Sequence, residues 1–465
     1  MKSKKRRIIQ GGMGVGVSNY KLAREVSLNG GLGIVSGTGL KTVFIRRLQL
    51  GDKDMLKALE AFPNQEISEK AFKRHFSEEG KLENHNFKLS PMFGLDSPKS
   101  LIERNILANF AEVYLAKLGH NEPVGINYLE KIQLPHLSSI YGAMLAGVDV
   151  ITMGAGIPRQ VPNILDRLSE GKDVSYKLFV EGATKDWETF FDPKTFLETE
   201  ELKRPDFLGI VSSNTLAQTL KQKSYGTIDG LIIEGHTAGG HNATPRRKGT
   251  TFYGEPEYTD KDEVNLEKIR RLELPYWLAG SYGSPDKLKF AIEQGAEGIQ
   301  VGTLFALADE SGITKDFKEK ILRYIKENKA DIYTDPKASP TGFPFKVFRI
   351  KGSSSDEEVV QCRDRICDLG YLRTLYETEE GKLGYRCPSE PVEDFLRKGG
   401  KLEDTVGRLC VCNALSSNIG IGQINPNGEV EPFLITSGKD IKGVEKLISD
   451  KQSYSVKDVM NYLNS

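Results

Sequence analysis

Eight short runs of β-branched and other apolar residues alternate with helical stretches between about residues 6 and 308. This alternation is typical of repeated βα units, whose strands form a parallel sheet. Eight is the number of strands that closes a parallel barrel. The sequence therefore predicts an α/β protein built on a parallel (β/α)8 TIM barrel. The predicted strands are Arg7–Gln10, Leu32–Ser36, Pro123–Tyr128, Val148–Met153, Phe207–Ser212, Gly230–Ile233, Tyr276–Gly280 and Gly298–Gly302.

The chain has 465 residues, whereas a minimal barrel takes about 250. We assign residues 1–308 to the barrel, with a charged helical insertion at about 40–121. Residues 309–465 form a C-terminal extension, predicted to be a lid over the barrel or a subunit interface. Within it, 407–415 are expected to pack at the barrel mouth. Helices are predicted after Ser284-Pro285, where Ser caps the helix and Pro fits its first turn, and over Ser455–Leu463.

The charge balance excludes some classes of partner. Lys and Arg number 64, as do Asp and Glu, so net charge gives no sign of nucleic-acid binding. No apolar run reaches the roughly 18 residues needed to cross a membrane. The basic start, Lys2–Arg7, lacks the apolar segment of a secretory signal and is expected to be a frayed terminus. We expect a cytoplasmic protein that acts on a small-molecule substrate. Whether it forms a homo-oligomer is left open.

Glycine-rich turns follow the last two predicted strands. Barrels commonly bind phosphate at this position through bare backbone N–H groups, which a Cβ atom would keep out of reach. A Rossmann fingerprint fits less well, because Gly31-Leu-Gly33 and Gly14-Val-Gly16 both lack its third glycine. We therefore predict a phosphate-binding site in these turns. The residues assigned to it are Ala279, Gly280, Ser281, Gly283, Gln300, Val301, Gly302 and Thr303.

Other predicted strand ends carry further candidates. Ala238, Gly239 and Gly240 follow strand six and would let backbone press against a flat ring system. His241 comes next and is the candidate catalytic residue, since a histidine beside such a ring can donate a hydrogen bond or relay a proton. His236, in the same loop, is the weaker candidate. The remaining candidates for cofactor binding are Gly11, Gly12 and Met13 after strand one and Asn127 after strand three.

These stretches together resemble the nitronate monooxygenase (2-nitropropane dioxygenase) family of FMN enzymes, related to the flavin-containing enoyl-ACP reductases. The resemblance spans about residues 7–308 and implies FMN, with its ring over strands one, three and six and its phosphate at the last two turns. The matching stretches are Gln10-Gly-Gly-Met13-Gly, Gly125-Ile-Asn127, Gly154-Ala-Gly156-Ile-Pro158, Glu234-Gly-His-Thr-Ala-Gly-Gly-His241, Ala279-Gly-Ser-Tyr-Gly283 and Val301-Gly-Thr303.

The resemblance leaves two reactions open, nitronate oxidation and enoyl reduction. The well-studied nitronate oxidisers have a catalytic histidine after strand four, where this chain has Gly154. Thr152–Pro158 and His241 look more like the enoyl reductases. The family's usual activity, oxidation of an alkyl nitronate with oxygen, is our first expectation. The alternatives are an FMN-dependent enoyl-(ACP/CoA) reductase that uses NAD(P)H, and a flavin-binding protein that has lost its activity.

The five cysteines all lie beyond residue 361, so the barrel offers no thiol nucleophile of the kind that nucleotide dehydrogenases use. Four thiolates could hold zinc or an iron–sulfur cluster, but the spacing lacks a C-x2-C pair. We therefore assign no metal ligands, favour free thiols in a reducing compartment, and leave a metal open. The cysteines are Cys362, Cys367, Cys387, Cys410 and Cys412.

Overall fold

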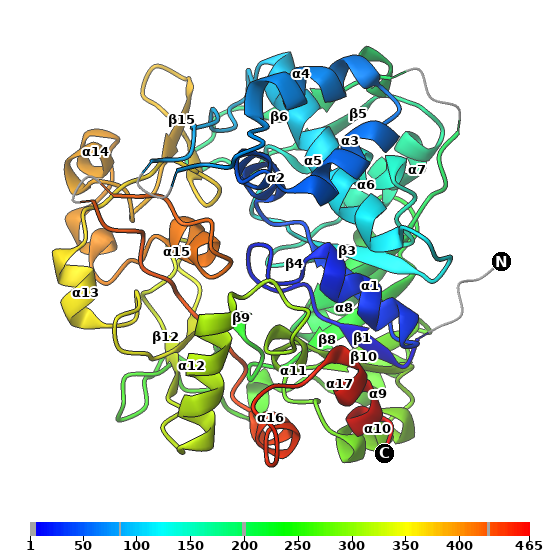
Figure 1. Ribbon diagram of the computed structural model, residues 1–465. Helices are drawn as coiled ribbons and strands as arrows, with labels where there is room; N and C mark the ends of the chain where they lie inside the picture. Colours follow the sequence, from blue (N-terminus) through cyan, green and yellow to red (C-terminus); the bar gives the residue numbers. More distant parts are fainter. Residues whose placement is uncertain (1–5, 83–84, 198–200, 426–427) are drawn as a thin grey trace.

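The computed structural model describes residues 6–82, 85–197, 201–425 and 428–465. Its main sheet has eight parallel strands in the order β1-β11-β10-β8-β7-β4-β3-β2. A parallel bridge between Ile9 and Leu32 joins the two ends, so the sheet closes into a (β/α)8 barrel (Figure 1). All eight predicted strands are confirmed. They are β1 (Ile8–Gln10), β2 (Gly33–Ser36), β3 (Val124–Leu129), β4 (Val150–Gly154), β7 (Asp206–Val211), β8 (Gly230–Glu234), β10 (Tyr276–Ala279) and β11 (Gly298–Val301).

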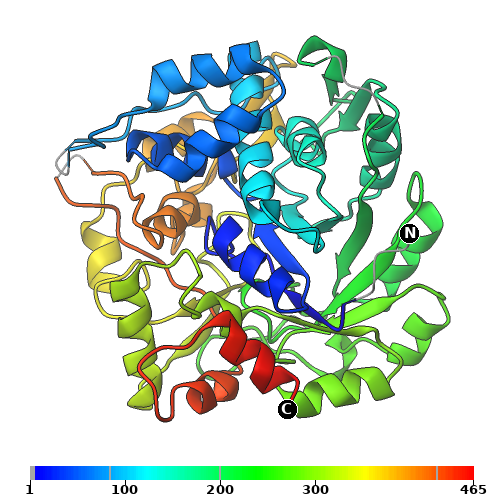
Figure 2. The same ribbon diagram turned by 45° about the vertical axis from the view of Figure 1, so that its right-hand side comes forward.

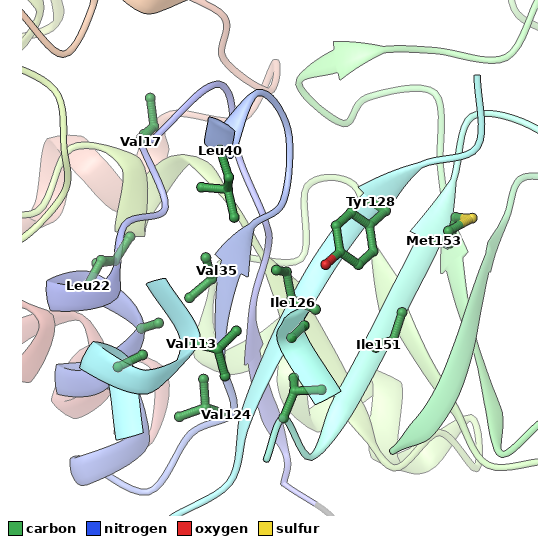
Figure 3. Packing of buried hydrophobic residues seen from close by; sticks show 14 of the residues in the cluster. Val17, Leu22, Val35, Leu40, Val113, Val124, Ile126, Tyr128, Ile151 and Met153 are labelled. Atoms are coloured by element: carbon green, nitrogen blue, oxygen red, sulfur yellow. The ribbon is translucent and has the colours of Figure 1, made fainter. Parts of the chain in front are cut away.

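Alternate strand residues face opposite sides of the barrel wall, as the pleat of a strand requires. One buried cluster, which includes Ile9, Ile232 and Trp277, fills the barrel interior. The residues between them face outward and pack against helices. Figure 3 shows this outer layer, with Val35 and Ile126 beside Val113 of the long helix α5 (Lys99–Lys117). The strands therefore have little polar surface except at their ends.

Helices surround the barrel, and the last of them comes from the far end of the chain. Helix α17 (Val456–Leu463) begins at the predicted Ser455, which caps it reciprocally with Asp458. It contacts α1 and α10 on the outside of the barrel (Figures 1 and 2). The other helices of this ring are α1 (Tyr20–Leu28), α5, α6 (His136–Leu145), α7 (Val161–Ser169), α8 (Asn214–Lys223), α9 (Leu266–Arg270) and α10 (Pro285–Glu293), whose predicted Ser284 cap is present.

The insertion between β2 and β3 is helical at both ends. It contains α2 (Leu40–Gln49), α3 (Lys53–Ala61) and α4 (Gln65–His75), which pack on each other and on α5. Residues 76–98, outside the gap at 83–84, are not helical. A hairpin that the sequence did not predict, β5 (Val174–Lys177) and β6 (Glu188–Phe191), follows α7.

The C-terminal extension is joined to the barrel by a small antiparallel sheet of order β12-β13-β9. Strand β9 is only Gly240–His241, in the loop after β8, and β13 (Phe345–Phe348) pairs with it. No strand of this sheet was predicted. The remaining elements are α11 (Thr303–Ala306), α12 (Lys315–Lys326), β12 (Ile332–Asp335), α13 (Glu357–Cys362), β14 (Thr374–Glu377), β15 (Leu383–Arg386), α14 (Val392–Arg397), α15 (Val411–Ser417), α16 (Lys442–Leu447) and three short 3-10 turns at Pro193–Thr195, Asp260–Asp262 and Leu402–Thr405.

Among the described residues, no helix combines the length and the apolar character needed to span a bilayer.

Candidate active site

A cavity of about 510 Å³ lies at the carboxyl ends of the barrel strands. This volume is in the range of small-molecule and cofactor sites, which are typically about 300–1,000 Å³. Every residue that the sequence analysis singled out for cofactor binding, together with His241, lines this cavity. The turns after β1, β8, β10 and β11 are separated in sequence by up to almost 300 residues. The barrel therefore brings the predicted site residues to one place.

The turns after β10 and β11 form one end of the cavity. Ser281 has a φ of 59°, a left-handed conformation that costs a residue with a side chain about 1–2 kcal/mol. Gly280 has a φ of 89° and lies against the backbone of Gly235. Within the described part of the chain, no hydrogen bond uses the N–H groups of Gly302 or Thr303. These turns therefore offer backbone donors to a ligand.

His241 is held between the barrel and the extension. Its Nε2 lies 2.6 Å from Ser339 Oγ, and its ring packs edge-on against Phe345 with centroids 4.8 Å apart. Burial lowers the pKa of His241 to about 4, and the positive charge of Lys131 acts in the same direction. At neutral pH the imidazole is therefore uncharged and acts as a hydrogen-bonding group rather than as a cation.

Lys346, on β13, fixes the loop that carries His241. Its side chain is completely buried, and its Nζ donates to His236 O at 2.6 Å and to Asn242 Oδ1 at 2.7 Å. Asn242 Nδ2 donates in turn to Ala238 O at 3.0 Å. Burial lowers the pKa of Lys346 to about 7. No motif or spacing in the sequence distinguishes this lysine from those on the surface.

Glu234, at the end of β8, also lines the cavity and was missed as a site residue. Burial raises its pKa to about 7, and the nearby positive charge of Lys346 limits this rise. A carboxyl group with a near-neutral pKa in a cavity is a candidate general acid or base. The signal available in the sequence was its place directly after a predicted barrel strand, Gly230–Ile233.

The polar side chain of Asn127, at the end of β3, is held mainly by the protein itself. Asn127 lines the cavity, but its Nδ2 donates to Gly12 O at 3.4 Å and its Oδ1 accepts from Thr152 Oγ1 at 2.9 Å. A Cβ on Gly12 would lie 2.4 Å from the Cβ of Asn127. Gly12 is therefore required for packing between β1 and β3, whatever ligand the cavity binds.

His236 is not among the cavity-lining residues. Its ring stacks on Tyr258 with centroids 4.4 Å apart, and its Nδ1 lies 3.4 Å from Glu263 Oε1. These contacts fix the loop between β9 and α9. Of the two histidines of the motif, only His241 is placed to meet a ligand in the cavity.

The extension supplies a large part of the cavity wall, which the sequence did not predict residue by residue. Ser437 and Gly438 lie beside the turn after β11, and Gly438 N donates to Thr303 Oγ1 at 3.0 Å. Val411, Cys412 and Leu415 also line the cavity, so part of 407–415 lies at the barrel mouth as expected. Others from the extension are Phe343, Phe345, Tyr371, Leu372, Asn418, Ile435, Thr436 and Asp440.

Four of the five cysteines, Cys367, Cys387, Cys410 and Cys412, line one small pocket beside the main cavity. Cys362 is exposed and lies apart. All five are free thiols. In the described residues, no group of three or more His, Cys, Asp or Glu side chains is arranged to hold a metal ion.

Residues 188–334 match the family model described as nitronate monooxygenase. This segment carries the loop after β8 and the turns after β10 and β11, and the match confirms the resemblance that these motifs indicated. The match supports the expectation that the chain is an enzyme and, in general terms, a flavin-dependent oxidoreductase. No curated protein matches the chain.

Among solved structures, FabK from Thermotoga maritima is 17% identical, with 99% of this chain and 91% of that chain covered and a TM-score of 0.50. A nitroalkane oxidase from Streptomyces ansochromogenes is 13% identical, with coverages of 98% and 94% and a TM-score of 0.45. At these identities the likeness to FabK shows the fold alone.

Proposed function

We propose that this protein is an FMN-dependent oxidoreductase of the nitronate monooxygenase type, which oxidises an alkyl nitronate with oxygen. The observation that carries the proposal is the single cavity that gathers the motifs of the resemblance, of which those after β8, β10 and β11 lie inside the matched segment. We also propose that residues 309–465 act as the lid of this cavity, since they supply much of its wall.

The cavity residues fit FMN. The free N–H groups of Gly302 and Thr303, with the turn at Gly280–Ser281, would hold the phosphate. The backbone at Gly11–Met13 and Gly239–Gly240 would hold the ring, because the four glycines there carry no side chain that would keep it away. A Cβ on Gly11 would meet no protein atom closer than 3.6 Å, so protein packing does not explain that glycine. When bound, FMN supplies the electron transfer that the reaction needs.

The protein residues would orient the substrate and move protons. Neutral His241, held by Ser339, would hydrogen-bond a polar substrate atom. Glu234 would take up or release a proton near pH 7, as its raised pKa allows. The apolar wall from the extension, including Phe345 and Leu372, would exclude bulk water and strengthen these interactions.

One observation favours the second candidate, an FMN-dependent enoyl thioester reductase that uses NAD(P)H. Gly154 ends β4 and lines the cavity, and a Cβ there would lie 3.0 Å from Ile210. The position where the nitronate oxidisers have a histidine is therefore closed by an apolar side chain. In this reading His241 would position or protonate the substrate.

The purified protein tests these proposals directly. Oxygen uptake driven by propane 2-nitronate alone supports the first candidate. NAD(P)H oxidation that requires crotonyl thioester, without nitronate turnover, overturns it in favour of the second. A protein that binds FMN and turns over neither substrate corresponds to the inactive flavin binder.

A further inference from the structure

The helical insertion contains a buried group of basic side chains that the cavity does not use. Lys41 comes from α2, His75 from the end of α4 and Arg104 from α5, and these three helices pack on one another. The exposed fractions of the three residues are 3%, 5% and 7%. None of them lines the candidate active site. Buried cations in proteins are normally paired with an anion or with hydrogen-bond acceptors. We therefore looked for the acceptors of these three side chains.

These three side chains have almost no acceptors. Arg104 makes no hydrogen bond or ion pair with any described residue, and its Nε is buried without a partner. Both ring nitrogens of His75 are likewise buried and unpartnered. Lys41 Nζ donates to Pro91 O at 2.7 Å and lies 4.8 Å from the ring centroid of Phe93, with no carboxylate within ion-pair distance among the described residues.

The charges that face this group are mostly positive. Arg46 and Arg373 act on Lys41, and Arg74 and Lys88 act on His75. Burial lowers the pKa of Lys41 to about 7 and that of His75 to about 4, and the positive charge of Arg104 acts on both groups in the same direction, as do these neighbours. Glu103 is the carboxylate that acts on Arg104, but the two form no ion pair.

The neighbouring cations have other partners. Arg46 donates to Ile421 O and lies 3.8 Å from Asp368. Arg373 donates to Phe93 O and Gly370 O. Their acceptors therefore do not neutralise Lys41 and Arg104, and the cluster keeps an excess of positive charge.

Two hydroxyl groups add further unused donors. The Oγ atoms of Ser68 and Ser90 are buried and have no hydrogen-bond partner among the residues that the structure describes. Ser68 lies two turns before His75 on the same buried face of α4, and Ser90 precedes Pro91, the acceptor for Lys41. Arg74 and Lys88 are exposed, so the cluster lies close to the surface.

We propose that Lys41, His75 and Arg104 form a binding site for a phosphate-type oxyanion, distinct from the flavin cavity. A tetrahedral dianion would accept from the Arg104 guanidinium, from Lys41 and from the Ser90 hydroxyl beside it, and would supply the missing negative charge. A single carboxylate has too few oxygen atoms for this number of donors. The same chemistry is offered by inorganic phosphate and by the phosphate group of a metabolite.

The test uses the full chain loaded with FMN, so that added phosphate cannot occupy the turns after β10 and β11. Melting temperature and calorimetry are followed while inorganic phosphate replaces chloride at constant ionic strength. The wild-type protein is expected to bind phosphate saturably. Arg104→Met is expected to weaken binding by about tenfold or more, and, in phosphate-free buffer, to melt no lower than wild type, because an unpaired buried charge is removed.

The matched control is Arg271→Met, which removes one positive charge from a 74% exposed side chain paired with Glu267 and should leave the phosphate response of the insertion unchanged. Lys41→Met serves if Arg104→Met does not fold. The proposal is overturned if phosphate changes the melting temperature no more than chloride does. It is also overturned if phosphate affects the wild-type protein, Arg104→Met and Lys41→Met equally. The Arg104-dependent phosphate response is expected whether or not the protein turns over a nitronate or an enoyl thioester. Failure of the proposed oxidoreductase activity can therefore be told apart from failure of the oxyanion site. The same titration with glucose 6-phosphate distinguishes the two sources. Tighter binding than that of inorganic phosphate indicates a metabolite phosphate, and weaker binding indicates the free ion.

Discussion

Lys346 Nζ lies 2.7 Å from Asn242 Oδ1, and through this bond a strand of the C-terminal extension holds the loop that follows barrel strand β8. The same Nζ also reaches the backbone at His236. The extension and the barrel therefore share the construction of the site, and the loop that carries His241 depends on a residue more than a hundred positions further along the chain.

Replacement of Lys346 by Met should leave His236 O and Asn242 Oδ1 without their buried donor. We expect the free energy of unfolding to fall by roughly 3 kcal/mol, and FMN affinity to fall with it because the Gly239–Gly240 backbone loses its support. Lys439→Met is the control, since Lys439 is 42% exposed and pairs with Glu255. That variant should change stability by less than about 1 kcal/mol. Equal effects in denaturant unfolding would contradict the role of Lys346.

Glu234 should make the binding of an anionic substrate depend on pH. Its pKa of about 7 lies above the ordinary 4.5, so folding favours the uncharged form, and its contribution to stability is lost as pH rises from 4.5 through 7. Above pH 7 the ionised carboxylate should repel a nitronate and raise KM by about tenfold. Glu234→Gln should remove this dependence. A KM that still rises in the variant would show that another group is responsible.

The buried histidines should make the protein sensitive to acid. His241 and His136 both have pKa values lowered to about 4 by burial. Since the unfolded chain takes up these protons near pH 6.5, the stability they contribute is present above pH 6.5 and is lost as pH falls through 4. NMR titration of the imidazole protons should show neither ring protonating above pH 5. A His241 midpoint near 6.5 would contradict the buried environment.

The left-handed backbone of Ser281 should cost folding free energy and, in return, position the turn after β10 for a ligand. Ser281→Gly should raise the free energy of unfolding by about 1 kcal/mol, because glycine adopts a positive φ without strain. Asn328, with a φ of 54°, follows helix α12 and is not among the cavity-lining residues, so Asn328→Gly is the matched control. Only the Ser281 variant should change FMN affinity. Equal FMN affinity in both variants would argue against a ligand at the turn after β10.

The barrel could be predicted from the sequence because each strand is a short apolar run that ends at a turn residue. Ile8 and Ile9 both fit this pattern, whichever side of the wall they face. The strand ends then predicted the cavity lining, since parallel strands bring these ends together. The interpretation of Gly12 was incomplete. Its missing Cβ also makes room for Asn127, so packing requires a glycine at this position, which lines the cavity and stays a predicted cofactor residue.

The contribution of the extension could not be predicted, because it rests on contacts between distant segments. Strand β9 is two residues long and forms only because β13 lies beside it, so neither had a periodic signal of its own. Lys346 resembles any surface lysine in sequence, and its burial depends on the loop it contacts. Cys367 and Cys410 are likewise brought to one pocket by tertiary packing alone.

The central claim, that the turns after β10 and β11 hold the phosphate of FMN, is tested most directly by comparing FMN with riboflavin. Gly302→Ala suits this purpose, because Gly302 has a φ of −105° and an added Cβ would meet no atom closer than the Met13 sulfur at 3.4 Å. Titration of the wild-type protein should show FMN binding about a hundredfold more tightly than riboflavin. In the variant this difference should largely disappear at unchanged melting temperature. Equal affinity of the wild-type protein for both flavins, or no binding of either, would contradict the account.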